Sequence, residues 1–173
     1  MSNHIFVDLE HTGGTQRHIL ELAVVDSSGK TLFNQRIKPP KSVYYDKKSM
    51  QLWNISANYC HKIYPKNVQE CKELVIYMPQ LREIFAGKIL VAHNASCELS
   101  ILPQELVDSL SGNFCTYKSF MTQYPKTKSG LGPALSFAGI TLQDAHTALA
   151  DAIGCMDLFY WLTQPKGQGA FDL

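Results

Sequence analysis

The sequence predicts an α/β domain in which helices pack against a mixed β-sheet. Two patterns and the chain length favour this class. Three strand-like segments come first, two of them joined by a hairpin turn, and short strands then alternate with segments of helical periodicity. At 173 residues the chain is long enough for a single domain with its own hydrophobic core.

The first part of the chain is expected to supply the antiparallel strands. The turn at residues 27–30 has the sequence Ser-Ser-Gly-Lys, and Pro39-Pro40 ends the strand-rich part. Residues 41–65 show no clear period, and we expect one or two short helices there, around residues 50–53. The expected strands cover residues 4–9, 19–25 and 31–37.

The rest of the chain is expected to alternate helices and strands. Apolar residues recur at helical spacing over residues 68–85, where Pro79 should kink the helix and Gly87 should end it. We expect residues 1–163 to form the domain and residues 164–173 to form a flexible tail. The other expected elements are strands over residues 89–92 and 114–117, helices over residues 95–102, 133–137 and 147–162, and a helix that ends near residue 124.

Composition excludes several classes of protein. A formal net charge of +1 is too small for the strong positive field of a typical duplex-binding protein. The five cysteines form no Cys-x-x-Cys pair and no zinc-finger spacing, so we expect reduced thiols. The chain begins without a secretory signal and has no run of the ~18 apolar residues that a membrane helix needs. These features predict a cytoplasmic protein without a membrane partner.

Two carboxylates stand out on the first expected strand. Asp8 and Glu10 are two residues apart, so their side chains point to the same face of that strand. Like charges beside buried residues repel each other, and a bound Mg²⁺ would resolve the conflict. For an isolated Asp-x-Glu pair, a strand with one solvated face is the more common explanation.

A second signal lies at the start of the last expected helix. Thr147 is a suitable N-cap, which places Asp151 early in the helix and His146 on the loop before it. Histidine has an ordinary pKa of about 6.5, which suits a general base that acts on water at neutral pH. Taken alone, His146 fits an ordinary surface or capping residue at least as well.

The segment Val91-Ala92-His93-Asn94-Ala95-Ser96-Cys97-Glu98-Leu99 supplies a third signal, because an apolar strand ends there at polar residues. The simpler explanation is that His93 and Asn94 begin a turn and that Glu98 is solvated in the first turn of a helix. The other explanation is chemical, with Glu98 as part of a site.

Four segments in this order, IFVDLEHTGG, ILELAVVD, VAHNASCELSIL and HTALADA, resemble the DEDDh family of 3′–5′ exonucleases over about residues 5–162. The resemblance is greatest to the group of exonuclease X and the polymerase III proofreading subunits. It implies a ribonuclease H-like fold, with a five-stranded mixed sheet whose three antiparallel strands come first. It also implies that two Mg²⁺ or Mn²⁺ ions are held by Asp8, Glu10, Glu98 and Asp151, and that His146 is the general base. Most family members have aspartate where this chain has Glu98.

The same resemblance implies a reaction and a substrate. The family hydrolyses the terminal phosphodiester at a 3′ end and releases nucleoside monophosphates, and the subgroup favours single-stranded DNA and roles in DNA repair or proofreading. The alternatives are a weakened module that binds nucleic-acid ends without cutting them, and an accessory subunit of a polymerase. Trp53, Tyr44 and Tyr45 are either core residues or platforms for bases. The residues expected to contact substrate are His11, Thr12, Gly13, His93 and Asn94.

The end of the chain carries a short motif. Gln168, Phe171 and Leu173 resemble the Gln-x-x-apolar-x-apolar peptides through which bacterial replication and repair proteins bind the sliding clamp. A frayed tail with two incidental apolar residues is the simpler explanation.

Overall fold

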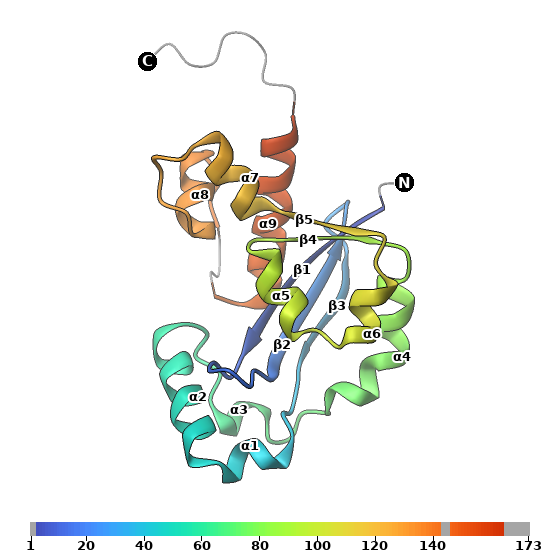
Figure 1. The fold of residues 1–173 in the computed structure, drawn as a ribbon, viewed down its shortest axis with the longest axis vertical. Helices are drawn as coiled ribbons and strands as arrows, with labels where there is room; N and C mark the ends of the chain where they lie inside the picture. The colour runs from blue at the N-terminus through green and yellow to red at the C-terminus, as the bar shows by residue number, and fades with distance from the viewer. Residues whose placement is uncertain (1–2, 143–145, 165–173) are drawn as a thin grey trace.

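The structure is a computed structural model and describes residues 3–142 and 146–164. Its centre is a five-stranded sheet with the strand order β3-β2-β1-β4-β5 (Figure 1). Strand β2 pairs antiparallel with both β1 and β3, whereas β4 pairs parallel with both β1 and β5. The predicted mixed sheet that begins with three antiparallel strands is therefore confirmed. The strands are β1 (His4–His11), β2 (Ile19–Asp26), β3 (Thr31–Arg36), β4 (Ile89–Ala92) and β5 (Gly112–Cys115).

Helices cover both faces of the sheet. Side chains alternate along β1, so neighbouring residues of this strand pack against helices on opposite faces. Ile5, Val7 and Leu9 point into the core formed with α4, α5 and α6, while Phe6 packs against α9 on the opposite face. Among the described residues, no helix is both long and apolar enough to cross a bilayer. The helices are α1 (Lys41–Tyr45), α2 (Lys47–Tyr59), α3 (Pro65–Val68), α4 (Leu74–Phe85), α5 (Ala95–Ile101), α6 (Gln104–Ser109), α7 (Thr116–Gln123), α8 (Leu131–Phe137) and α9 (Ala148–Thr163).

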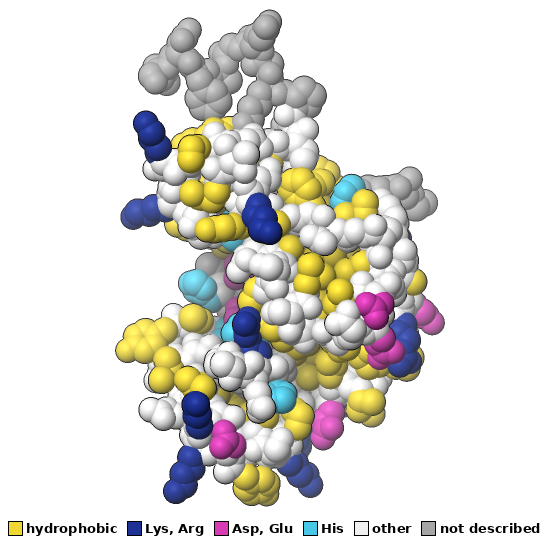
Figure 2. Space-filling model, viewed as in Figure 1, with side chains coloured by type: hydrophobic (Ala, Val, Ile, Leu, Met, Phe, Trp, Pro, Cys, Tyr) yellow, Lys and Arg dark blue, Asp and Glu magenta, His cyan; other side chains and the backbone are white. Residues whose placement is uncertain are grey.

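Two smaller helical groups have hydrophobic clusters of their own. Helices α1 to α3 form a separate core around Trp53, which also includes Leu20 of β2. Helices α7 and α8 pack around Phe120 against Leu158 of α9. The two groups lie at opposite ends of the molecule (Figure 1), and the surface between them is hollowed, with acidic and histidine side chains in the hollow (Figure 2).

The chain between residues 41 and 110 is more helical than predicted. Three helices replace the one or two short ones expected, and the predicted helix over residues 68–85 begins only at Leu74. Gly87 has a φ of 66° and follows the end of α4, as predicted. Helix α6 is not among the predicted elements, because the helix expected over residues 95–102 stops before Pro103, and proline after a helix predicts its end. Pro103 instead stands at the start of α6, where its missing N–H costs nothing.

Trp53 is a core residue. It is fully buried, and its indole Nε1 donates a hydrogen bond to the carbonyl oxygen of Ile63 at 2.8 Å. Tyr44 packs edge-on against the same ring. Of the three aromatic residues considered as base platforms, Tyr45 is the exposed one, with 83% of its surface accessible.

Candidate active site

Three carboxylates meet on the α9 face of the sheet. Asp8 and Glu10 follow Phe6 at intervals of two along β1 and therefore share its face. Asp151, in the first turn of α9, reaches them from the covering helix. Ligand atoms of Asp8, Glu10 and Asp151 all lie within 4.8 Å of one another, so one cation can contact all three.

Hydrogen bonds fix the start of α9 against the sheet. The side chain of Thr147 accepts a bond from the backbone N–H of Ala150 at 3.3 Å, which confirms the predicted cap. The backbone N–H of Ala148 donates to Oε2 of Glu21 on β2 at 3.1 Å. Glu21 is the cross-strand partner of Glu10, so the helix start is tied to the strand pair that carries the carboxylates.

Strand β1 leaves this part of the sheet accessible. The pairing with β4 covers residues 4–6 of β1, and the chain turns away after Ala92 into α5. Asp8 and Glu10 lie beyond that pairing but remain paired with β2. The gap left by the end of β4 is where α5 brings Glu98 to the site.

Burial and mutual repulsion raise the pKa of the carboxyl groups. For Glu10, burial is the largest cause and the charge of Asp151 the next, and the pKa is about 8. The pKa of Asp8 lies well above its ordinary value, mainly through burial and then through the charge of Glu98. Two carboxylates at such separations repel by roughly 3–4 kcal/mol at an effective dielectric constant of about 20. Without a cation, the cluster would therefore retain protons near neutral pH.

Glu98 borders the cluster from α5. It is 5% exposed, and burial is the main cause that raises its pKa to about 7. It stands outside the group of three that lie within 4.8 Å, although its charge acts on Asp8. Its Oε2 is buried and has no hydrogen-bond partner among the described residues. Leaving a buried oxygen without a hydrogen-bond partner costs roughly 1–3 kcal/mol. A partner from outside the described residues would therefore stabilise Glu98.

These residues fit a divalent cation. Carboxylate oxygens are the donors that Mg²⁺ and Mn²⁺ prefer, and the cluster of Asp8, Glu10 and Asp151 presents three carboxyl groups at one point. A cation there would favour the ionised forms of these groups, and it would supply a partner for Glu98, directly or through its water.

His146 lies beside the cluster and open to solvent. It precedes α9 on the loop, as predicted, with an exposed side chain and a φ of 72°. Burial, the largest cause, raises the pKa of Asp151, whereas a backbone hydrogen bond from His146 and its charge lower it. An imidazole in this position can exchange protons with water while it stays next to the carboxylates.

A family model of exonucleases, RNase_T, matches residues 5–159, a range that contains every residue of this cluster. The chain belongs to the RNase_T exonuclease family. This membership confirms the predicted relationship to the DEDDh-type 3′–5′ exonucleases.

Solved structures of exonucleases share the fold at low sequence identity. Exonuclease X in complex with 5′-overhanging duplex DNA is 19% identical with a TM-score of 0.63, and the match covers 90% of this chain and 89% of that one. A 3′-exonuclease solved for its recognition of the histone mRNA stem-loop is 13% identical with a TM-score of 0.58, covering 90% and 79%. The protease and nuclease unit of Neurospora crassa Pan2 is 16% identical with a TM-score of 0.58, covering 91% and 26%.

The curated relatives are larger proteins. Ubiquitin carboxyl-terminal hydrolase MINDY-1 of Homo sapiens and its counterpart in Bos taurus are each 30% identical over 98 residues. That match covers 55% of this chain and 21% of either relative, so the matched part spans about a fifth of their length.

The end of β1 and the residues that follow it form a loop that closes on itself. His11 Nδ1 accepts a bond from the N–H of Gly13 at 2.9 Å, and Gly13 has a φ of 77°. Thr12 is 2% exposed, and its Oγ1 accepts from the N–H of His18 at 3.1 Å. Burial, followed by the charge of Arg17, lowers the pKa of His11 to about 4. These bonds shape the loop, and the predicted substrate contacts of His11, Thr12 and Gly13 stay predictions.

His93 and Asn94 mark the turn from β4 into α5. The Nε2 of His93 lies 2.9 Å from the carbonyl oxygen of Ser129, and its Nδ1 lies 3.0 Å from Oγ1 of Thr116. Because a carbonyl oxygen only accepts, Nε2 carries the proton and Nδ1 accepts from the threonine hydroxyl. Asn94 adopts a left-handed conformation with a φ of 80°. His93 thus joins the end of β4 to α7 and to the α7–α8 connection, and its predicted substrate contact stays a prediction.

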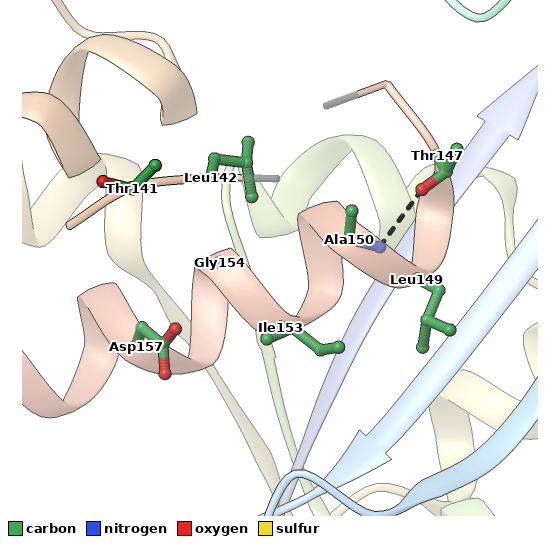
Figure 3. Close-up of a pocket in the computed structure, with 8 residues that line it drawn as sticks. All are labelled: Thr141, Leu142, Thr147, Leu149, Ala150, Ile153, Gly154 and Asp157. Atoms are coloured by element: carbon green, nitrogen blue, oxygen red, sulfur yellow. Dashed lines mark hydrogen bonds between the residues drawn. The ribbon is translucent and has the colours of Figure 1, made fainter. Parts of the chain in front are cut away.

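A pocket of about 390 Å³ lies on another face of α9. Figure 3 shows Leu142 and Thr141 beside the helix, near Gly154. A Cβ at Gly154 would come within 2.9 Å of Leu135 and of Leu142, so only glycine allows this approach. Asp8, Glu10 and Asp151 do not line this pocket, which is therefore distinct from the acidic site.

The predicted clamp residues Gln168, Phe171 and Leu173 lie outside the described residues.

Proposed function

We propose that the protein is a metal-dependent 3′–5′ exonuclease that removes nucleoside monophosphates from the 3′ end of nucleic acid, with single-stranded DNA as the preferred substrate. The observation that carries the proposal is the convergence of Asp8, Glu10 and Asp151 within 4.8 Å, with the exposed His146 beside them. The family match supplies the exonuclease class.

The proposed mechanism assigns separate tasks to the residues. Asp8, Glu10, Glu98 and Asp151 would hold two Mg²⁺ or Mn²⁺ ions, and such ions would supply activation of the attacking water and charge stabilisation for the leaving 3′ oxygen. A ring nitrogen of His146 takes the proton from the attacking water and releases it to solvent, to which this side chain is open. The backbone bond between His146 and Asp151 keeps the base next to a metal-binding carboxylate.

The preference for DNA rests on the sequence motifs shared with the exonuclease X group and on the fold of exonuclease X, which was solved with duplex DNA. A similar fold recognises an RNA stem-loop, so both nucleic acids belong in the test. A protein would distinguish them at the 2′-hydroxyl of the terminal nucleotide.

The test uses a 5′-labelled single-stranded DNA and its RNA counterpart with Mg²⁺, Mn²⁺ or EDTA, and an Asp8→Ala variant beside the wild type. We expect a metal-dependent ladder that shortens from the 3′ end, faster on DNA and absent in the variant. A ladder on a 3′-labelled strand that begins at the 5′ end would refute the direction. Binding without cleavage under either metal would make the end-binding module the better description.

We also propose that Gln168, Phe171 and Leu173 bind a sliding clamp, which would concentrate the enzyme at DNA ends and serve repair or proofreading. The support is the spacing of these three residues. A pull-down with purified clamp should lose the protein when residues 168–173 are removed, and equal capture of both forms refutes the interaction.

A further inference from the structure

Arg17 lies between two residues that adjoin the proposed metal ligands in sequence, His11 after Glu10 and Cys97 before Glu98. It belongs to the loop between β1 and β2, and it directly precedes His18, where the loop closes. The N–H of Thr12 donates to the carbonyl oxygen of His18 at 3.0 Å, and the N–H of His18 donates to Oγ1 of Thr12 at 3.1 Å. The backbone at residue 17 is therefore held close to the end of β1.

The side chain of Arg17 reaches across to α5. Its Nη1 donates a hydrogen bond to Sγ of Cys97 at 3.3 Å. Cys97 immediately precedes Glu98, the buried carboxylate that borders the site. Arg17 also lies close enough to His11 for its charge to act on that ring. The side chain of Arg17 thus links the β1–β2 loop to α5, the helix that carries Glu98.

Arg17 has no carboxylate partner in the part of the chain that the structure describes. The ion pairs there are Arg36 with Glu21 and Arg82 with Glu105. A thiol is a weak acceptor, and one bond to it leaves most of the donors of the guanidinium available. Arg17 is exposed, and Figure 2 shows basic side chains beside histidines along the hollow. An exposed cation whose thiol partner directly precedes Glu98, and which is bonded to no carboxylate among the described residues, is available for an incoming anion.

We propose that Arg17 binds a phosphate of the strand being degraded and holds its 3′ end over the acidic cluster. The inference rests on the proposed exonuclease function and adds a positioning residue to it. The planar guanidinium can bind two oxygens of one phosphate, which fixes orientation as well as distance. The strand must approach a cluster of negative groups, and a cation at its edge offsets that repulsion where the strand enters.

The test measures binding of a 5′-labelled single-stranded DNA by fluorescence anisotropy at a series of salt concentrations. All proteins carry Asp8→Ala, so that no strand is consumed. Arg17→Gln should weaken binding about tenfold, which corresponds to about 1.4 kcal/mol, because it removes a charged hydrogen bond to phosphate. It should also reduce the slope of log Kd against log salt by about 0.7, the value for one phosphate contact on a single strand.

Two further variants separate the possible roles of Arg17. Arg17→Lys keeps the charge but not the planar fork, so it should preserve the salt slope while binding more weakly than arginine. Arg82→Gln removes an exposed arginine on α4 and should change neither quantity. Thermal unfolding of each variant reports whether Arg17 acts only on the fold.

The outcomes also separate this inference from the proposed function. If the wild type cleaves DNA and Arg17→Gln has an unchanged salt slope, Arg17 does not contact phosphate, and only this inference fails. If the wild type neither cleaves nor binds any strand, the proposed function fails with it. A reduced slope confined to the Arg17→Gln variant, together with cleavage by the wild type, supports both.

Discussion

The two walls of the acidic site are built differently. On the β1–α9 wall, three carboxylates lie within 4.8 Å of one another on a central strand and a capped helix. On the α5 wall, a single buried carboxylate, Glu98, keeps one oxygen without a partner among the described residues. Arg17 donates a hydrogen bond to the thiol of Cys97, the residue before Glu98, although a carboxylate would be a stronger acceptor.

This difference shows which wall has its final geometry before a ligand binds. The β1–α9 wall takes its geometry from the sheet register and the Thr147 cap, so its spacing is preset. The α5 wall holds groups that have no strong partner among the described residues, and the proposed partners are a cation or its water for Glu98 and a phosphate for Arg17. Substitutions on the first wall should therefore abolish activity, whereas those on the second should tune it.

The largest effect is expected for Asp8→Asn. The amide keeps the shape but cannot supply the charge that binds a divalent cation, which is worth several kcal/mol in the transition state, so turnover should fall at least about 10³-fold. Single-turnover cleavage and calorimetric titration with Mg²⁺ would measure both losses. Asp108→Asn, on the distant helix α6, serves as the control and should behave as wild type. Retained Mg²⁺ affinity in Asp8→Asn would argue against the metal site.

Removal of the imidazole in His146→Ala should cut turnover by ~10²-fold or more and leave Mg²⁺ binding largely intact. The reason is that His146 acts on the water and does not hold the ions in the proposed mechanism. The pH dependence of turnover should also lose the step that reports the base. Unchanged turnover would remove the assignment of His146 as the base.

Glu98→Gln should have a smaller effect, because Glu98 stands outside the group of three. Loss of a charge that acts next to the ligands should weaken Mg²⁺ binding about 10-fold to 100-fold, with a matching demand for higher Mg²⁺ in the cleavage assay. Saturating Mg²⁺ should restore most of the rate. If it does not, Glu98 belongs to the preset wall, and the contrast between the walls is wrong.

The smallest effect is a dependence of stability on pH in EDTA. The pKa of Glu10 is raised from 4.5 to about 8, so between these values the folded protein holds a proton that the unfolded chain has lost. Stability should therefore fall as pH rises through this window. Thermal unfolding should show a Tm that drops by a few degrees in the wild type and drops less in Glu10→Gln. Identical pH slopes in the two proteins would contradict the burial of an ionisable Glu10.

The sequence predicted the parts of the site that depend on local rules. Alternation placed Asp8 and Glu10 on one face, and a capping residue placed Asp151 in a first turn. The sequence did not reveal the hydrogen bond from Ala148 to Glu21, because that contact depends on the register between β1 and β2. The missed helix α6 followed from reading Pro103 as an end signal, although proline also begins helices.

Contacts between distant segments could not be predicted from the sequence, because they also depend on how the elements pack together. Arg17 and Cys97 are 80 residues apart, and no pattern in either segment points to the other. His93 carried a motif, but its bonds to Ser129 and Thr116 depend on how α7 folds back over β4. Side-chain chemistry is local in sequence, whereas these partners are chosen by the packing of whole elements.

The carboxylates of the cluster come from β1 and α9, which are far apart in the sequence, and this determines when the site can form. During synthesis, Asp8 and Glu10 leave the ribosome long before Asp151, so a nascent chain cannot assemble the proposed metal site. Detachment of α9 alone would dismantle it again, even with the sheet intact. A chain in which α9 is missing or detached would thus lack the proposed metal site.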